Sequence, residues 1–415
     1  MRIGIFTNLT EFNPAYSLCS IVESQAVMLA RYGHDVTVFV SELADTSQWP
    51  FPVNNTLLEL PERFPYVKIS GLSEGHIKFA ETLASHLTGQ CADFDVVFTH
   101  DWILTGWHLP YAEALRIATN NCKRTRFFHW IHSIPNNRCD WWSLYRYGTE
   151  RNWLVYPNRT DRSHVAAQFE CLIKDVIPVP HIVDPRLFLD FCELTCSFID
   201  DFQNVLQADI VQVYPASSDR LRGKGLDRII NIFVELKRRG KSVCLVVANQ
   251  WANKLLKKED LDWYRRLAER NGLGDDEFIF TSEWRNGEFE SGIPRRTLRE
   301  LMSLSNLFIA PTMSESFFLA LPEASLSGCV IPLQNASLYN QREVGGNCGI
   351  YKEFGSWQRP WQPRNEGQYF SDIASIVLER LEDNEAVKLK THIRQTNNMD
   401  SVYMNHYEPM LGRTK

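Results

Sequence analysis

The sequence predicts an α/β protein built from two doubly wound domains, and three observations support this fold class. The chain has 415 residues, more than one hydrophobic core usually holds, so two domains are expected. An apolar strand at 2–8, a helix at 22–31 and a strand at 35–40 form a βαβ unit, which implies parallel strands with right-handed crossovers. A second strand–helix pair of this kind occurs later in the chain, with a strand at 209–214 and an amphipathic helix at 229–238.

The other elements are expected where short apolar runs end in polar or turn residues. Further strands are predicted at 95–99, 127–133, 242–248, 277–282, 306–310 and around 330–333. The proline-rich stretch 176–188 is interpreted as a passage between domains. We therefore predict one domain at 1–205, a second at 206–395, and a C-terminal helix at 396–415 that crosses back to the first.

Composition places the chain among ordinary globular proteins. Hydrophobic residues make up 44% and charged residues 23%. No apolar run reaches the length of about 18 residues that would indicate a transmembrane helix, and the N-terminus enters a strand without the pattern of a signal peptide. The ten cysteines are scattered and include no Cys-x-x-Cys pair, which favours free thiols in a reducing compartment. These features predict a cytoplasmic protein.

The most informative stretch is 311–328, Pro-Thr-Met-Ser-Glu-Ser-Phe-Phe-Leu-Ala-Leu-Pro-Glu-Ala-Ser-Leu-Ser-Gly, which follows the strand predicted at 306–310. Its composition predicts a polar turn and then a helix. Glu315 and Glu323 are separated by slightly more than two helical turns, so both carboxylates lie near one face if the helix begins early. Backbone amides at 316–319 would then suit a phosphate.

Two glutamates at this spacing are weak evidence by themselves. The alternative is that Glu315 is a solvated side chain favoured at a helix start, with Glu323 on the exposed face. A pair of carboxylates would also suit a glycosidase, which needs them on either side of the scissile bond. No other feature of the sequence supports hydrolysis.

Together with the rest of the chain, this stretch resembles the donor-sugar signature of retaining glycosyltransferases of the GT-B fold, family four. Further matches are Gly33-His-Asp-Val-Thr-Val38, His100-Asp-Trp102 and Lys224-Gly225. The resemblance implies two Rossmann-like domains facing across a cleft. It also implies transfer of a sugar from a nucleotide-sugar donor, UDP- or GDP-linked, to an acceptor hydroxyl with retention at the anomeric carbon. Neither a metal nor another cofactor is expected.

The same resemblance implies roles for residues of the second domain. Glu315 is expected to face the sugar, as a catalytic residue, and Glu323 the ribose of the nucleotide. Lys224 is expected to neutralise the diphosphate, since the leaving group gains charge as the glycosidic bond breaks. Its partner arginine is Arg220, with Arg222 as the alternative. The other donor-binding residues implied are Ser316, Phe317 and Phe318 beside the motif, and Trp284, which would stack on the base.

In the first domain, the resemblance implies that His132 contacts the sugar from the opposite side of the cleft. The alternative is a half-buried histidine satisfied by backbone groups. The acceptor side is assigned to His100 and to an aromatic, arginine-rich segment at 137–162 that includes Arg138, Trp141 and Trp142. Such a segment can stack bases or sugars while its arginines hold phosphates, or it can be a core helix with a solvated basic face.

Three interpretations of function follow. The first is a glycosyltransferase whose acceptor is a glycan, a lipid-linked saccharide or a small molecule. The second is a phage-type DNA glycosyltransferase acting on hydroxymethylated pyrimidines, because 116–162 contains nine Lys or Arg against three acidic residues. The third is an inactive sugar-nucleotide-binding protein, because Cys19 and Ser20 stand where the family usually has two glycines and the partner arginine is displaced.

Overall fold

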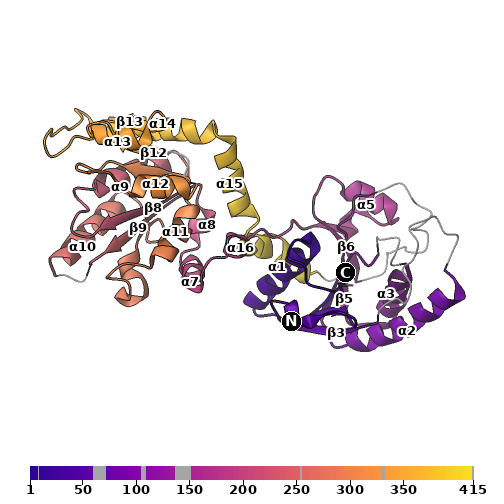
Figure 1. Cartoon of the computed structure of the whole chain (residues 1–415). Coiled ribbons are helices and arrows are strands. Elements are labelled where there is room, and N and C mark those ends of the chain that lie inside the picture. The colour runs from indigo at the N-terminus through magenta and orange to yellow at the C-terminus, as the bar shows by residue number, and fades with distance from the viewer. Residues whose placement is uncertain are drawn as a thin grey trace. The chain divides into compact units, whose positions relative to one another are not determined.

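The computed structural model of the chain describes residues 1–7, 9–58, 72–103, 109–135, 151–252, 255–328 and 332–413. The chain divides into two compact units (Figure 1): a first unit of Met1–Asp184 with Asn397–Lys415, and a second unit of Pro185–Thr396. The division therefore falls before the boundary predicted at 205/206. The reason is that Phe191, Phe198 and Ile199 pack into the hydrophobic core of the second unit.

A seven-stranded parallel sheet forms the centre of the first unit, in the order β3-β2-β1-β4-β5-β6-β7. The strands are β1 (Arg2–Phe6), β2 (Asp35–Ser41), β3 (Val53–Leu57), β4 (Val96–His100), β5 (Arg126–Trp130), β6 (Asn152–Tyr156) and β7 (Val176–Pro178). The chain order reverses between β1 and β4. In sheets of this type, ligands bind beyond the carboxyl ends of the strands at such a reversal.

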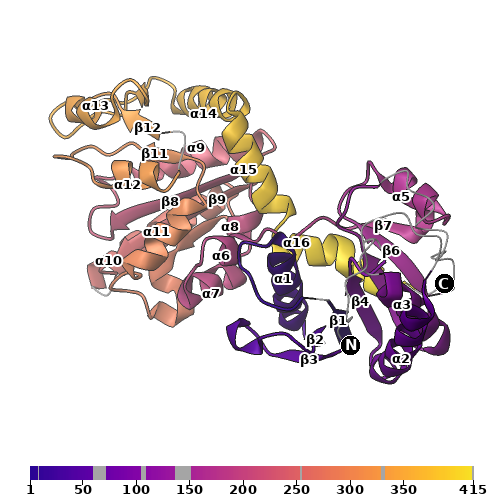
Figure 2. The same cartoon turned by 45° about the vertical axis from the view of Figure 1, so that its right-hand side comes forward.

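Helices cover both faces of this sheet. One face packs against α2 (Glu74–Cys91), α3 (Leu109–Asn121) and α5 (Arg162–Gln168). The other packs against α1 (Ser17–Arg31) and a C-terminal helical segment composed of α16 (Met399–Val402), a π-helical turn (Tyr403–Tyr407) and α17 (Glu408–Leu411). Figure 2 shows α1 and α16 together on one side of the sheet, with α2 and α3 on the other.

The second unit contains two three-stranded parallel sheets, in the orders β10-β9-β8 and β11-β12-β13. The strands are β8 (Ile210–Ser217), β9 (Val243–Gln250), β10 (Phe278–Phe280), β11 (Phe308–Ala310), β12 (Pro332–Asn335) and β13 (Ile350–Lys352). Its helices are α6 (Pro185–Phe188), α7 (Glu193–Asp201), α8 (Asn204–Gln207), α9 (Leu226–Arg238), α10 (Leu255–Arg270), α11 (Arg295–Ser303), α12 (Ala320–Leu326), α13 (Tyr339–Gly345), α14 (Glu366–Glu382) and α15 (Glu385–Thr396).

A buried glutamine joins the two small sheets at their edge strands β8 and β11. The side-chain amide of Gln212 donates to the carbonyl of Ile309 at 3.0 Å, and its oxygen accepts from the Ile309 amide at 2.9 Å. The side chain thus provides a donor and an acceptor to the backbone of β11, which would otherwise be left unpaired in the interior. The chain runs from β8 to β10 on one side of this junction and from β11 to β13 on the other, so the order reverses here too.

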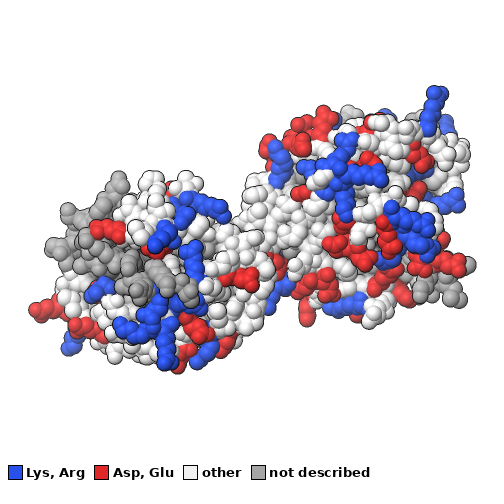
Figure 3. All heavy atoms as spheres, turned by 180° about the vertical axis from the view of Figure 1, so that it is seen from behind, with Lys and Arg blue, Asp and Glu red and all other residues white. Residues whose placement is uncertain are grey.

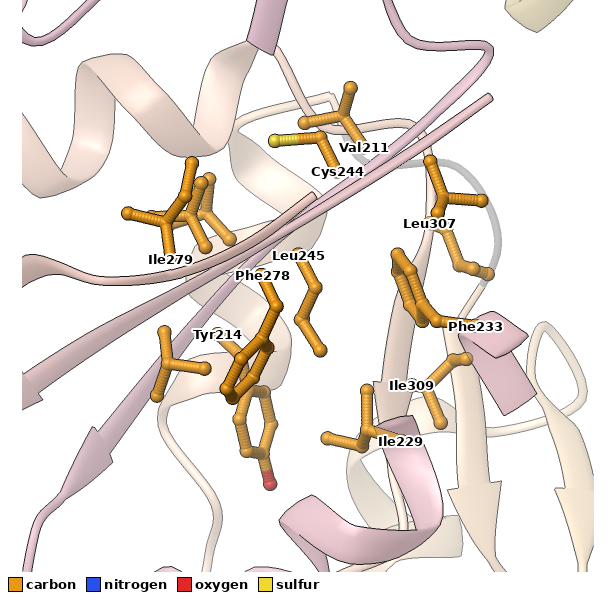
Figure 4. Packing of buried hydrophobic residues seen from close by; sticks show 14 of the residues in the cluster. Val211, Tyr214, Ile229, Phe233, Cys244, Leu245, Phe278, Ile279, Leu307 and Ile309 are labelled. Atoms are coloured by element: carbon orange, nitrogen blue, oxygen red, sulfur yellow. The ribbon is translucent and has the colours of Figure 1, made fainter. Parts of the chain in front are cut away.

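The apolar face of α9 anchors the helix in the core of the second unit. Ile229, Phe233 and Leu236 recur at helical spacing and are fully buried. Figure 4 shows Ile229 and Phe233 pointing toward Leu307 and Ile309 of the segment that includes β11. This packing holds the start of α9, and the loop before it, at the junction of β8 and β11.

The predicted fold class is confirmed, because each unit combines parallel strands with helices in a doubly wound arrangement. Each also reverses its chain order next to its first strand, β1 in one unit and β8 in the other. With right-handed crossovers, such a reversal places helices on both faces of the strands. Among the residues that the structure describes, no helix is both long enough and apolar enough to cross a bilayer.

Candidate functional site

A cavity of about 330 Å³ lies at the carboxyl ends of β8 and β9 in the second unit. Its lining comes from the ends of these strands, the loop between β8 and α9, α11 and the segment before it, and α12. The lining residues are Pro215, Ala216, Ser217, Arg220, Lys224, Ala248, Gln250, Trp251, Gly292, Ile293, Leu298, Ala320 and Glu323. Both its position and its mixture of apolar surface with a few charged groups are typical of ligand sites in α/β proteins.

Gly225 explains why the loop before α9 lies so close to the loop after β11. Its φ is +69°, and a Cβ atom there would lie 2.7 Å from the carbonyl oxygen of Pro311. Only glycine adopts this backbone without strain and also leaves room for Pro311. A bond from the Met313 amide to the Gly223 carbonyl, 2.7 Å long, ties the two loops together.

Within these joined loops, the ammonium of Lys224 donates to Glu315 Oε1. Only 13% of the lysine side chain and 11% of the glutamate side chain are exposed. The hydroxyl of Thr312 donates to the same carboxylate oxygen at 3.2 Å, and the ring of Phe318 lies 5.0 Å below the lysine nitrogen. The structure thus brings the two catalytic candidates of this unit into direct contact.

The helix of the glutamate motif begins at Ala320, later than an early start would require. Phe318 has a φ of +64°, so the backbone cannot continue as a right-handed helix through this position. Glu315 therefore stands on a loop, and the amides at 316–319 precede the helix instead of forming its first turn. Phe318 is buried under Lys224, whereas Ser316 and Phe317 are exposed.

Glu323 lies in the first turn of α12 and lines the cavity. Its Oε1 accepts from Arg295 Nη2 at 2.9 Å, and Arg295 is itself strongly exposed. The other carboxylate oxygen, Oε2, has no hydrogen-bond partner within the described ranges of the chain. Such a carboxylate at a cavity wall can accept hydrogen bonds from ligand hydroxyls.

Of the two candidate arginines, Arg220 lines the cavity together with Lys224. Arg222 instead lines a different cavity of the same unit. The spacing explains the difference, because the Lys224 amide bonds to the carbonyl of Arg220 at 2.8 Å in a tight turn. This turn directs the side chains of Arg220 and Lys224 to one cavity and the side chain of Arg222, which lies between them, to another.

Trp284 does not fit its predicted role as a platform for the base. Its indole is buried in the core, where it stacks on Phe289 with ring centroids 5.0 Å apart and contacts the edge of Phe198. Its Nε1 donates to Asp201 at 2.7 Å, and the guanidinium of Arg285 lies 4.6 Å from the ring centroid. The ring therefore has no face open to a nucleotide.

Trp251, which the sequence analysis did not single out, is the aromatic residue of the cavity. Its side chain is 53% exposed, and its φ of +58° is unusual for a residue that is not glycine. The adjacent Ala252 amide bonds to the carbonyl of Glu290 at 2.8 Å, which fixes the chain just after the turn. The sequence signal that could have found it is its place three residues after the strand predicted at 242–248, at the carboxyl end where ligands bind in such sheets.

In the first unit, three histidines gather where the chain order of the sheet reverses. His100 ends β4, His132 follows β5, and His181 follows β7. His100 Nδ1 and His132 Nε2 are 2.9 Å apart with nearly parallel rings, and the rings of His132 and His181 are 5.3 Å apart. The structure therefore places His100 beside the predicted sugar-binding residue His132.

The hydrogen-bond network assigns the protons of these rings. Gln25 donates its amide to Tyr407 at 2.8 Å, so its oxygen faces His100 Nε2 at 3.0 Å and accepts from it. His100 Nδ1 must then accept from His132 Nε2. The buried Nδ1 of His132 is left as a lone-pair acceptor without a hydrogen-bond partner among the described residues.

Burial keeps this cluster uncharged. Desolvation, with a smaller effect of His181, lowers the pKa of His132 to about 3. It also lowers the pKa of His100, which is fully buried, well below the usual value. Asp101 has a φ of +56° and accepts from the His132 amide at 2.9 Å; burial raises its pKa to about 6. Within the described ranges, no three His, Cys, Asp or Glu side chains are grouped so as to hold a metal ion.

The acceptor-side predictions are only partly covered by the structure. Arg138, Trp141 and Trp142 lie outside the described residues. His100 is enclosed by its neighbours, which fits a residue that positions His132 better than one that contacts an acceptor.

Several basic residues of 116–162 make internal contacts. Arg116 pairs with Glu113, Arg126 donates to the carbonyl of Arg413, and Arg162 donates to the carbonyl of Val176. On the face shown in Figure 3, positive and negative side chains are interspersed over both units. These observations favour local structural roles for the three arginines.

No protein-family model and no curated protein matches this chain. Solved structures that it is similar to include a glycosyltransferase from Rickettsia africae, at 11% identity and a TM-score of 0.37 over 99% of this chain and 98% of that one. Others are HepE from Anabaena in complex with UDP and glucose, and an α,α-trehalose-phosphate synthase (UDP-forming) from Burkholderia vietnamiensis. Each of these shares 13% identity and a TM-score of 0.35 over 99% of both chains. Because these TM-scores are low, the function proposed below rests on the residues of the site.

Proposed function

We propose that this protein is a glycosyltransferase that moves a sugar from a nucleoside diphosphate sugar to an acceptor hydroxyl. One observation carries the proposal: a single cavity at the carboxyl ends of β8 and β9 combines Arg220, Lys224, Glu323 and the exposed indole of Trp251. A nucleotide sugar needs cations for its diphosphate, an acceptor for its ribose hydroxyls and an apolar surface for its base. The cavity supplies each of these.

The donor is expected to bind with its diphosphate between Arg220 and Lys224, which stand at the two ends of one turn. Charge-assisted hydrogen bonds to phosphate are roughly twice as strong as neutral ones, so this turn is the natural anchor. Glu323 Oε2 is available for the ribose hydroxyls, and Trp251 can stack on the base. The volume of about 330 Å³ lies within the usual range for small-molecule sites.

The chemistry follows from the charge that develops during transfer. The bond between the anomeric carbon and the diphosphate oxygen breaks, the acceptor oxygen bonds to that carbon, and the acceptor's proton leaves with the diphosphate. Lys224 and Arg220 stabilise the negative charge on the departing group. When Lys224 turns toward the diphosphate, Glu315 is released to face the sugar, where its carboxylate stabilises positive charge at the anomeric carbon.

Retention at the anomeric carbon, a UDP- or GDP-linked donor and independence from metal belong to the same proposal, through the resemblance of 311–328 to family four. His132 is assigned the role of accepting a hydrogen bond from a sugar hydroxyl through Nδ1, the atom that lacks a partner in the described chain. The acceptor is a glycan, a lipid-linked saccharide or a small molecule.

The test is a thermal-shift screen with UDP-, GDP-, ADP- and TDP-sugars, followed by a transfer assay with the nucleotide that binds. A ligand at a hundred times its dissociation constant stabilises the folded state by about 2.7 kcal/mol. We expect the nucleotide sugar of one base to raise the melting temperature of the wild type but not that of Lys224→Ala. Lys237→Ala is the control, because Lys237 pairs with Glu277 outside the cavity and should leave the shift unchanged.

Three other outcomes change the conclusion. If no nucleotide sugar stabilises the wild type, the cavity is not a donor site. An equal shift in Lys224→Ala would remove the diphosphate role of this lysine. Binding without turnover over a broad panel of acceptors would instead make the protein an inactive sugar-nucleotide binder.

A further inference from the structure

A second cavity of the same unit, of about 510 Å³, is lined by two tryptophans and three charged side chains. Its lining residues are Arg222, Asp227, Arg228, Met313, Trp357, Pro360, Trp361 and Gln362. It shares none of the residues that line the donor cavity, although Arg222 belongs to the same turn as Arg220 and Lys224. A smaller cavity of about 80 Å³ continues from it past Asp227, Arg228, Trp361 and Gln362.

The loop that carries the tryptophans is held in a defined shape. Gly355 has a φ of +72°, and a Cβ atom there would lie 2.7 Å from the amide nitrogen of Trp361, so the chain can double back only with glycine at this position. The fully buried side chain of Asn335 donates to the carbonyl of Gly355 at 2.5 Å and to that of Thr312 at 2.8 Å. These bonds connect the tryptophan loop to the loop after β11.

Trp357 lines the cavity. Its side chain is 56% exposed, and its edge lies 3.8 Å from the position that a Cβ atom of Gly223 would take. Trp361 is inclined at 62° to Tyr369 with ring centroids 5.1 Å apart, which fixes the second ring. An indole that stays exposed on a fixed loop leaves a large apolar surface in contact with water. This favours a role for Trp357 in binding a ligand over a role in packing.

The polar groups around the two rings include both donors and acceptors. The side chain of Arg222 is exposed, and its guanidinium makes no ion pair or hydrogen bond in the described part of the chain, so it is available to a ligand. The guanidinium of Arg228 donates one long bond, 3.4 Å, to the carbonyl of Pro311. Asp227 contributes a half-buried carboxylate, and Gln362 an amide with a donor and an acceptor.

We propose that this cavity binds a saccharide, at a site separate from the donor. A pyranose ring has an apolar C–H face, which suits the indole of Trp357, and a rim of hydroxyls that both donate and accept hydrogen bonds. Asp227 favours a ligand with hydroxyl donors, because its carboxylate only accepts hydrogen bonds and a bound phosphate would leave it desolvated without a donor from the ligand. A neutral sugar matches the mixed set of donors and acceptors without this penalty.

In a glycosyltransferase, a site of this kind holds the acceptor or product glycan away from its reacting end. That role rests on the proposed function, whereas saccharide binding by the cavity does not. The two can therefore fail separately, and the experiment below measures them separately.

The full-length wild type is first applied to an array of immobilised neutral oligosaccharides. Titration calorimetry then measures its affinity for the oligosaccharide that it binds. Trp357→Ala should weaken this affinity by about ten-fold or more, because the variant loses one aromatic contact with the sugar and the apolar area that this contact buries. Trp263→Ala is the matched control: Trp263 lies on α10, outside both cavities, and is 49% exposed. It should leave the affinity unchanged. Thermal melting verifies that both variants are folded.

The proposal is overturned if the wild type retains no oligosaccharide, or if Trp357→Ala binds as tightly as the wild type. It is also overturned if inorganic phosphate or UDP displaces the oligosaccharide, since the site would then be an anion site. Trp357→Ala should keep the nucleotide-induced thermal shift of the wild type. Oligosaccharide binding in a protein that binds no nucleotide sugar would support this cavity and reject the donor site.

Discussion

Lys224 donates a hydrogen bond to Glu315, although 91 residues separate the two in the sequence. The lysine stands on the loop after β8 and the glutamate on the loop after β11, the strands between which the chain order reverses. Because both strands end at the same edge, the fold itself brings this cation and this carboxylate together. The ion pair is the link between the architecture of the second unit and its proposed chemistry.

The first prediction concerns the stability that this pair confers. Lys224→Met should lower the free energy of unfolding by about 2 kcal/mol, because it leaves the carboxylate of Glu315 largely buried without its cation. The double variant Lys224→Met/Glu315→Leu should regain most of this loss, since neither charge remains. Urea denaturation of the two variants and the wild type provides the comparison.

A control for that prediction is Lys237→Met, because the Lys237 side chain is 40% exposed in its pair with Glu277. Exposed ion pairs contribute about 0–1 kcal/mol, so this variant should cost less than Lys224→Met. Equal losses in the two lysine variants would contradict the special position of the Lys224–Glu315 pair. A double variant less stable than Lys224→Met alone would do the same.

A second prediction separates backbone strain from close contact at Gly225. Gly225→Ala and Gly240→Ala both place a side chain at positive φ, +69° and +82°, but only at Gly225 is there an atom within 4 Å of the new Cβ. Gly240→Ala should therefore lose about 1–2 kcal/mol of stability from strain alone. Gly225→Ala should lose more and should also weaken nucleotide binding, because the loop that carries Lys224 must move. Equal stability losses with unchanged binding would show that the contact with Pro311 has no such role.

A third prediction is that the base of the bound nucleotide stacks on Trp251. Stacking of a base on an aromatic side chain contributes about 1–3 kcal/mol, so Trp251→Ala should weaken nucleotide binding by about 5- to 150-fold. Trp251→Phe should retain a large part of the affinity, and Trp263→Ala should retain all of it. Fluorescence quenching on titration with the nucleotide provides a second measurement, since the exposed indole of Trp251 should lose emission when a base covers it. Unchanged affinity in Trp251→Ala would remove this residue from the donor site.

The sequence was sufficient to predict the fold class, and its motifs selected Arg220, Lys224 and Glu323, which line one cavity of the second unit. The apolar periodicity of 229–238 and the strand at 209–214 predict a βα unit, whereas Lys224, in the loop between them, was assigned through the resemblance of Lys224-Gly225 to the family's motif. The start of α12 could not be predicted, because it depends on the positive φ of Phe318, a conformation that is rare for a bulky side chain. The ring of Phe318 is buried beside Lys224, a residue far away in the sequence, and a local pattern does not contain this contact.

The roles of aromatic and histidine residues depend on contacts between distant parts of the chain. Trp251 and Trp284 both follow strands of the same sheet, and only the packing of Phe198 and Phe289 shows which of them is enclosed. Likewise His100 is buried against Gln25, whose amide is oriented by Tyr407, 382 residues further along the chain. Local patterns carry no information about such partners.

The last prediction concerns the acid sensitivity of the first unit. His129 is fully buried, with Nδ1 2.9 Å from the Thr99 hydroxyl and Nε2 3.1 Å from Asn152 Oδ1. Burial lowers its pKa to about 4. Between pH 6.5 and 4 the unfolded chain therefore binds more protons than the folded chain, and stability is lost as the pH falls through this range. At pH 5 the loss from this histidine is about 2 kcal/mol, and His132, with a pKa of about 3, adds a similar loss.

Asp101 acts in the opposite direction, because burial raises its pKa to about 6, and the stability that it contributes at low pH is lost as the pH rises through that value. Between pH 7 and pH 5, protonation of Asp101 increases the free energy of unfolding by only about 1 kcal/mol. The unit therefore remains less stable at pH 5 than at pH 7. His129→Gln should lower stability at both pH values but reduce the difference between them by about 2 kcal/mol. His164→Gln, at an exposed position, should leave the difference unchanged. Urea denaturation at pH 7 and pH 5 measures both, and an unchanged difference in His129→Gln would show that this histidine is not the source of the acid sensitivity.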